Sequence, residues 1–198
     1  LDARSEVQVL CPMHKGRAGT EALNLALQEH HTRGRPELVH SAPGRAHPRV
    51  FRVGDRVMQT RNDHERGVFN GDIGVVTAVQ EETQTLVVEV DGTPVAYDHK
   101  QVGALQLAYA VSIHKSQGSE FPAVVVPLLG EHHVMLRRNL LYTAVTRARR
   151  LCVIVGDPRA ITQAVHRGDA ARRYTGLSER LLAALRARLG DPDVVLDG

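Results

Sequence analysis

The chain has 198 residues, a hydrophobic fraction of 42% and a net charge of +3, so it can form a core, and its charge alone does not indicate a nucleic-acid partner. No apolar run approaches the ~20 residues of a membrane helix and no charged-then-apolar leader is present, so we expect no membrane partner and no signal peptide. Cys11 and Cys152 lie in apolar runs, which predicts buried thiols in a reducing, cytoplasmic compartment. The histidine pairs lack companion ligands at metal-binding spacing, so we expect no metal site.

The first quarter of the chain predicts one strand, one helix and a connection. EVQVLCP, residues 6–12, predicts a strand, and MHKGRAGT predicts a Gly-containing loop. EALNLALQEHH has apolar residues at helical spacing, with Thr20 as the expected N-cap. Residues 32–50 carry three prolines and little periodicity, so we expect an exposed connection there.

Residues 51–103 change to the period of β-structure. The runs VGDRVMQT, GDIGVVTAV, TLVVEVDG and TPVAYD are separated by turn residues. Asn70-Gly71 and Asp91-Gly92 are hairpin signals. About fifty residues of such short strands predict a small barrel of the SH3-like kind.

After residue 103, strands and helices alternate. ALQLAYAVS predicts a strand or short helix, and AVVVPLL and RLCVIVGD predict apolar strands. HHVMLRRNLLYTAVTRAR and PRAITQAVHR predict helices, and LSERLLAALRARLG, residues 177–190, predicts an amphipathic helix near the C-terminus. The predicted fold class is therefore α/β, with a parallel sheet covered on both faces and interrupted by the small barrel.

SIHKSQGSEFPAVVVP, residues 112–127, places polar groups directly before a predicted buried strand. Gly118 permits close approach of the backbone to a phosphate, and Glu120 could accept a hydrogen bond from a ribose hydroxyl. Four more side chains could donate hydrogen bonds to a nucleic-acid backbone: Ser112, His114, Lys115 and Ser116. An ordinary polar turn with solvated side chains explains the same composition, so the stretch alone leaves both interpretations open.

The sequence contains no GxxxxGK[ST] phosphate loop. A domain of this kind could still form the second wall of a nucleotide site, which needs a cation at the γ-phosphate. In NLLYTAVTRARR, helical spacing puts Arg147 on the face of the apolar residues, near the expected sheet edge. Alternatively, Arg147, Arg149 and Arg150 merely sit favourably at a helix C-terminus.

Taken together, VSIHKSQGSEFPAVVVP and RRNLLYTAVTRAR resemble motifs V and VI of superfamily 1 helicases, in the RecD-like branch. LCPMHKGRAGTEALNLALQ resembles the RecD segment just before the barrel. VGDRVMQTRNDHERGVFNGDIGVV is similar to the opening of the SH3-like subdomain inserted in the second RecA-like domain of that family. These likenesses cover most of residues 6–156 in the family order, whereas the Walker motifs of the first RecA-like domain and the family's usual stretch ahead of LDARSEV have no counterpart.

The resemblance implies a discontinuous second RecA-like motor domain over residues 1–50 and 104–175. The SH3-like barrel would occupy residues 51–103, and a C-terminal helix and tail residues 176–198. In such helicases two RecA-like domains clamp ATP with Mg²⁺ and ratchet along single-stranded DNA, 5′ to 3′ in this branch. The implied partners are single-stranded DNA and the first RecA-like domain of the same protein.

Carried over by position, Arg147 would be the arginine finger on the γ-phosphate. Gly118 would approach the phosphate, and Glu120 would hold the ribose hydroxyl. Contacts to the DNA backbone would come from six residues: Thr20, Asn24, Ser112, His114, Lys115 and Gln117. Without the first domain, we expect the chain alone to hydrolyse no ATP. The alternative is an ATP-independent nucleic-acid or protein interaction module that keeps the fold and needs neither Arg147 nor Glu120.

Overall fold

The computed structural model describes residues 2, 5–41, 48–168 and 180–181 of the chain. Four of its strands form a parallel sheet in the order β11-β10-β1-β9. They are β1 (Val7–Cys11), β9 (Ala110–Ser112), β10 (Phe121–Leu128) and β11 (Ala148–Gly156). The parallel sheet predicted from the apolar runs is confirmed.

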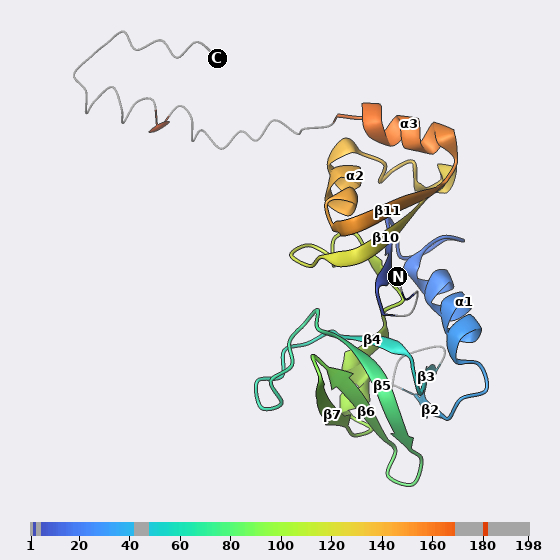
Figure 1. Cartoon of the computed structure of the whole chain (residues 1–198), viewed down its shortest axis with the longest axis vertical. Helices are drawn as coiled ribbons and strands as arrows, with labels where there is room; N and C mark the ends of the chain where they lie inside the picture. The colour runs from blue at the N-terminus through green and yellow to red at the C-terminus, as the bar shows by residue number, and fades with distance from the viewer. Residues whose placement is uncertain (1, 3–4, 42–47, 169–179, 182–198) are drawn as a thin grey trace. The chain divides into compact units, whose positions relative to one another are not determined.

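Three helices pack against this sheet. Helix α1 (Thr20–Thr32) lies against β9, α2 (Arg138–Val145) lies against β10 and β11, and α3 (Pro158–His166) packs beside α2 (Figure 1). Small residues of α2 and α3, Ala144, Ala160 and Ala164, let the helices approach the buried side chains of β10. The near-continuous burial along β10 is the physical reason why its sequence reads as one apolar run.

A second, antiparallel sheet forms the barrel in the order β7-β6-β5-β4-β8. Its strands are β4 (Arg56–Gln59), β5 (Ile73–Gln80), β6 (Thr85–Val90), β7 (Thr93–Tyr97) and β8 (Leu105–Leu107), with a short 3₁₀ turn η1 (Gln101–Ala104) before β8. Asp91 and Gly92 both have positive φ, 48° and 77°, as a two-residue hairpin turn requires. The β6–β7 hairpin predicted from this dipeptide is therefore confirmed.

The expectation of an exposed connection over residues 32–50 is wrong for residues 37–40 and 49–50, which lie in strands. Strands β2 (Glu37–His40) and β3 (Arg49–Arg52) form a hairpin of their own. Leu38 and Phe51 are 2% and 0% exposed and belong to the barrel core. The flanking prolines hid the alternation of buried and exposed side chains. The division into domains at residues 50/51 and 103/104 stays a prediction.

The segment ALQLAYAVS is two strands that serve different sheets. β8 pairs with β4 in the barrel, and β9 pairs with β1 in the parallel sheet. Between them, Ala108 and Tyr109 present carbonyl oxygens to the side-chain amide of Gln8, at 3.1 and 3.0 Å. This buried joint carries the chain from the barrel back into the parallel sheet.

Two helix predictions need correction. The helix expected from His132 onward begins only at Arg138, because Arg137 is extended, and it ends at Val145. Arg147 therefore follows the helix and lies beyond its last turn. In α1 the N-cap is Gly19, and Thr20 is the first helical residue. The helix and tail predicted over residues 176–198 fall outside the described residues, apart from residues 180 and 181.

Both cysteines are free thiols; Cys11 is buried as the sequence predicts, whereas Cys152 is only partly buried. Burial raises the pKa of the Cys11 thiol to about 12 and also raises the pKa of Cys152. Within the described ranges, no helix is both long and apolar enough to cross a membrane.

Candidate nucleic-acid and nucleotide site

The loop of residues 113–120 runs from one edge of the parallel sheet to the other. Val9 of β1 is level with both Ala110 and Val125. Ser112, at the end of β9, lies two residues beyond this level, and Phe121, at the start of β10, lies four residues before it. Along the strand direction, Ser112 and Phe121 are therefore six residues apart, which corresponds to ~20 Å. The two ends of the loop are therefore at opposite edges of the sheet.

At its first end, the loop is a tight turn held by its own polar groups. The Ser112 hydroxyl accepts a hydrogen bond from the Lys115 backbone N–H at 3.3 Å. Ser116 is 1% exposed, and its hydroxyl donates to the Ile113 carbonyl oxygen at 2.8 Å. The interpretation of Ser116 as a donor to nucleic acid is therefore wrong, because its hydroxyl is buried and used in the turn.

A groove of about 720 Å³ lies beside this turn, between α1, β3 and the β8–β9 segment. The groove brings together four of the six residues that the sequence assigned to DNA. It also includes several basic residues that the sequence did not assign to DNA. The four assigned residues are Thr20, Asn24, Ser112 and Lys115, and the further basic residues are His14, Arg49 and Arg52. Glu21 and Glu29 also line the groove, so its charge is mixed.

Two of the predicted DNA contacts have partners inside the protein. The Asn24 amide donates to the Ala110 carbonyl oxygen at 2.8 Å and accepts from the Ala110 N–H at 2.9 Å, which fixes α1 to β9. The Thr20 hydroxyl lies 3.1 Å from Nδ1 of His14. His14 was missed because a lone histidine in a loop carries no pattern. The structure thus gives Asn24 a clear structural role beside any contact with DNA.

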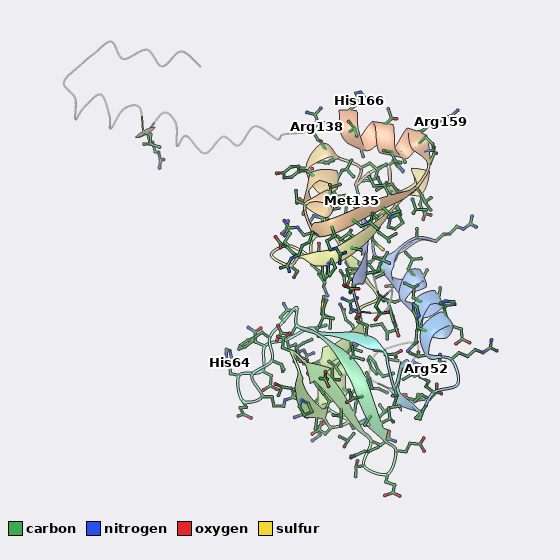
Figure 2. The ribbon with its side chains drawn as sticks, in the orientation of Figure 1. Arg52, His64, Met135, Arg138, Arg159 and His166 are labelled. Carbon is green, nitrogen blue, oxygen red and sulfur yellow. The ribbon has the colours of Figure 1, made fainter. Side chains whose placement is uncertain are left out.

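The other two predicted DNA residues, His114 and Gln117, lie on the far side of the turn. They line a separate hollow of about 360 Å³, which we call the α2 hollow. Nine residues line it: Ile113, His114, Gln117, Val134, Met135, Arg137, Asn139, Leu140 and Thr143. Of these, Met135 is labelled in Figure 2. The turn after β9 therefore separates the groove from the α2 hollow.

At the second end of the loop, Gly118 has φ +88°, and no other atom lies within 4 Å of where a Cβ would stand. The backbone there is open to a ligand. Glu120 pairs with Arg149, with Nε and Oε2 2.9 Å apart. Because both side chains are more than half exposed, this ion pair adds little stability and can open.

Arg147 lies directly beside these residues. Its guanidinium donates three hydrogen bonds, to the Thr143 carbonyl at 3.2 Å, the Ser119 carbonyl at 3.1 Å and the Thr146 hydroxyl at 3.3 Å. A guanidinium has five N–H donors, so two remain. The structure therefore brings together Gly118, Glu120 and Arg147, which the sequence assigned to the nucleotide.

A buried carboxylate that the sequence did not single out joins the barrel to α1. Asp55 is 0% exposed and accepts hydrogen bonds from four donors. They are the Gln28 amide, the Arg52 backbone N–H, the Thr32 hydroxyl and the Tyr109 hydroxyl. Burial, with the nearby Asp55 charge, raises the pKa of Tyr109, so this phenol stays protonated and donates. The network fixes the wall of the groove.

Within the described residues, no group of three or more His, Cys, Asp or Glu side chains is placed to hold a metal ion.

Sequence comparison finds two matching families. The UvrD-like helicase C-terminal domain family matches residues 107–155, which include the loop and Arg147. The ATP-dependent RecD-like DNA helicase SH3 domain family matches residues 23–90. The chain is 41% identical over 183 residues to the ATP-dependent RecD2 DNA helicase of Deinococcus radiodurans, covering 92% of this chain and 24% of the relative. It is 31% identical over 184 residues to the RecBCD enzyme subunit RecD of Mycolicibacterium smegmatis, covering 93% and 31%.

Solved structures share the fold. The Pif1 helicase from Bacteroides, in a crystal structure with ADP-AlF3 and single-stranded DNA, superposes with a TM-score of 0.62 at 23% identity, over 95% of this chain and 46% of that one. Pif1 of Candida albicans superposes with a TM-score of 0.57 at 18% identity, over 91% and 50%.

The fold and the two family matches define a RecA-like helicase domain that carries an SH3-like barrel. The chain belongs to the RecD-like branch of the superfamily 1 DNA helicases and corresponds to part of their C-terminal region. It spans about a quarter to a third of the length of the two curated relatives given above.

Proposed function

We propose that the chain is the second motor domain of an ATP-dependent DNA helicase that moves 5′ to 3′. In this role it supplies an arginine finger and contacts to the backbone of single-stranded DNA. One observation carries the proposal: a single loop, residues 113–120, joins the groove at one edge of the sheet to Arg147 at the other. The 5′ to 3′ direction rests on the resemblance to the RecD-like branch.

The DNA grip would lie in the groove. Lys115 and Thr20 place a cation and a hydroxyl on its wall, and His14 lies beside Thr20. Such side chains bind phosphates and position a strand without reading its bases. The exposed Lys115 ammonium lies 3.3 Å from the Gln106 amide oxygen, a contact that a phosphate can replace.

The wall that contacts the nucleotide would lie at the opposite edge of the parallel sheet from the groove. Gly118 leaves room for a phosphate, and Glu120 would accept from a ribose hydroxyl once its exposed pair with Arg149 opens. Arg147 would turn its two remaining donors to the γ-phosphate, where charge builds up in the transition state. Mg²⁺ and most of the ATP contacts would come from the first RecA-like domain of the same protein.

The proposal is tested with the purified chain and a labelled single strand. We expect weak binding that falls steeply with salt, little base preference and no ATP hydrolysis. Lys115→Ala should weaken binding and lower the slope of log K against log salt by about 0.7. Lys100→Ala, in an exposed turn of the barrel, is the matched control and should change neither quantity.

Equal losses in the two lysine variants would mean that binding is not centred on the groove. ATP hydrolysis by the chain alone would contradict the assignment to a second motor domain. DNA binding that never responds to nucleotide, in a protein that also carries the first domain, would favour the ATP-independent interaction module instead.

A further inference from the structure

The α2 hollow has an apolar wall that the chain itself leaves uncovered. Val134 and Met135 are 58% and 39% exposed, whereas the next residue, Leu136, is 1% exposed. These residues precede α2 and run into the extended Arg137, so helical periodicity does not account for their exposure. A planar apolar ligand that entered the hollow would cover both side chains and remove apolar surface from water.

The opposite wall of the hollow offers polar groups that can hydrogen-bond. His114 and Gln117 are exposed, and their side chains make no hydrogen bond within the described part of the chain. Asn139 uses its Oδ1 to accept from the Leu140 N–H at 2.8 Å, which leaves its Nδ2 group to donate. Apolar surface beside a few amides is the usual composition of a small-ligand site. Amides in particular pair with the edges of nucleobases.

The charge of the hollow also suits nucleic acid. Among its nine lining residues, all of them described, none is acidic, and Arg137 and His114 are basic. The groove, in contrast, includes Glu21 and Glu29. A wall without carboxylates does not repel the phosphates that accompany a base.

We propose that the α2 hollow holds one unstacked nucleobase of the single strand whose phosphates cross the groove. The inference rests on the proposed DNA grip and extends it. The turn after β9 is the common wall: Ser112 and Lys115 face the groove, and His114 and Gln117 face the hollow. Met135 and His114 supply surface for the face of the base, and Gln117 and Asn139 meet its edge. Because every base has an apolar face, the site accepts all four bases.

The test is the binding of the purified chain to short oligothymidylates in which one abasic residue is moved along the strand. In the wild-type chain, we expect the abasic residue to weaken binding about fivefold at one or two adjacent positions and little elsewhere. Met135→Ala should weaken binding to the intact strand and flatten this positional profile. Met135→Leu, which keeps an apolar wall, should retain the profile. Val165→Ala, an exposed apolar residue of α3, is the matched control and should behave as the wild type.

The other outcomes overturn the inference in distinguishable ways. If the chain binds the intact strand and no position of the abasic residue weakens binding, the base site is excluded and the proposed DNA grip is unaffected. If the position-dependent loss of affinity persisted in Met135→Ala and in Gln117→Ala, the base would bind outside the α2 hollow. If Met135→Ala weakened binding equally for intact and abasic strands, the hollow would not contact the base. No binding of any strand would overturn the DNA grip and the base site together. Thermal melts of each variant confirm that the fold survives.

Discussion

The Arg147 guanidinium donates from Nη1 to the carbonyl oxygen of Ser119 at 3.1 Å, and the Arg147 carbonyl accepts from the N–H of Phe121 at 2.8 Å. Arg147 is thus bonded both to the last part of the loop of residues 113–120 and to the first residue of β10. A shift of this arginine towards a phosphate has to break or move its bond to the loop. This is the physical basis for expecting nucleotide and DNA to affect each other's binding.

Replacement of the proposed finger is the most direct test of the nucleotide wall. In a helicase that carries both motor domains, we expect Arg147→Ala to slow hydrolysis by about 10³-fold or more while ATP still binds, because the lost charge acts in the transition state. Single-turnover hydrolysis at saturating ATP measures this. Arg150→Ala, an exposed neighbour, is the control and should remain within a few-fold of wild type. A hydrolysis rate within a few-fold of wild type for Arg147→Ala would show that Arg147 does not act on the nucleotide.

The Asp55 network predicts a large effect on stability. Asp55→Ala removes the buried acceptor of four donors, of which the Thr32 hydroxyl keeps another acceptor, the Gln28 carbonyl oxygen at 2.9 Å. We therefore expect the free energy of unfolding to fall by roughly 3–5 kcal/mol. Urea denaturation of the chain, followed by circular dichroism, measures the change. Glu82→Ala, at an exposed position in the β5–β6 turn, should change stability by less than about 0.5 kcal/mol. Equal effects of the two substitutions would show that the network does not hold the barrel to α1.

His132 predicts a pH dependence of stability. It is 0% exposed, and burial lowers its pKa below the ordinary value near 6.5, while Glu131 opposes the shift. The unfolded chain therefore binds the proton more readily than the folded one. The stability that the neutral imidazole provides is fully present above about pH 6.5 and is lost as the pH falls below it.

Melting temperatures between about pH 7 and pH 5 check this expectation. His132→Leu removes the acceptor for the Leu129 N–H, so the variant should be less stable at every pH. It should also lose less stability on acidification than the wild type, because the titrating group is gone. Parallel curves for the two proteins would mean that His132 titrates alike in the folded and unfolded states.

Much of the fold could be predicted because strands that are buried are made of apolar residues, and such runs are visible in the sequence. Strand β10 is buried along most of its length and reads as one apolar run. Strands β2 and β3 were missed because each is only four residues long and prolines lie beside them. The length of α2 was overestimated because Leu136 keeps the helical spacing and is buried, although it lies in the hydrogen-bonded turn before the extended Arg137.

The candidate site was predictable in its residue types and not in its grouping. The motifs point to Ser112 and His114 together, but the turn between them sends one to the groove and the other to the α2 hollow. That separation depends on hydrogen bonds of the turn, which sequence spacing does not reveal. Asp55 carried no signal at all, because a single aspartate before a strand is indistinguishable from a turn former until its four donors are seen.

In the proposed function, one loop, residues 113–120, serves DNA at its first end and nucleotide at its second. Such coupling is a free-energy difference between two states, and it must be reciprocal for binding. His114→Ala should weaken DNA binding, and Glu120→Ala should mainly weaken nucleotide binding. Each should also reduce the effect of nucleotide on DNA affinity. A plain polar turn predicts only a small loss of stability.

The most direct measurement is a titration of single-stranded DNA with and without a non-hydrolysable ATP analogue, in a helicase that carries both motor domains. Wild type, His114→Ala, Glu120→Ala and the control Val165→Ala are compared. We predict that the analogue changes the DNA dissociation constant of the wild type and the control, and changes it less in the other two. If His114→Ala and Glu120→Ala both kept the full wild-type change, the account of a loop that serves two ligands would be contradicted.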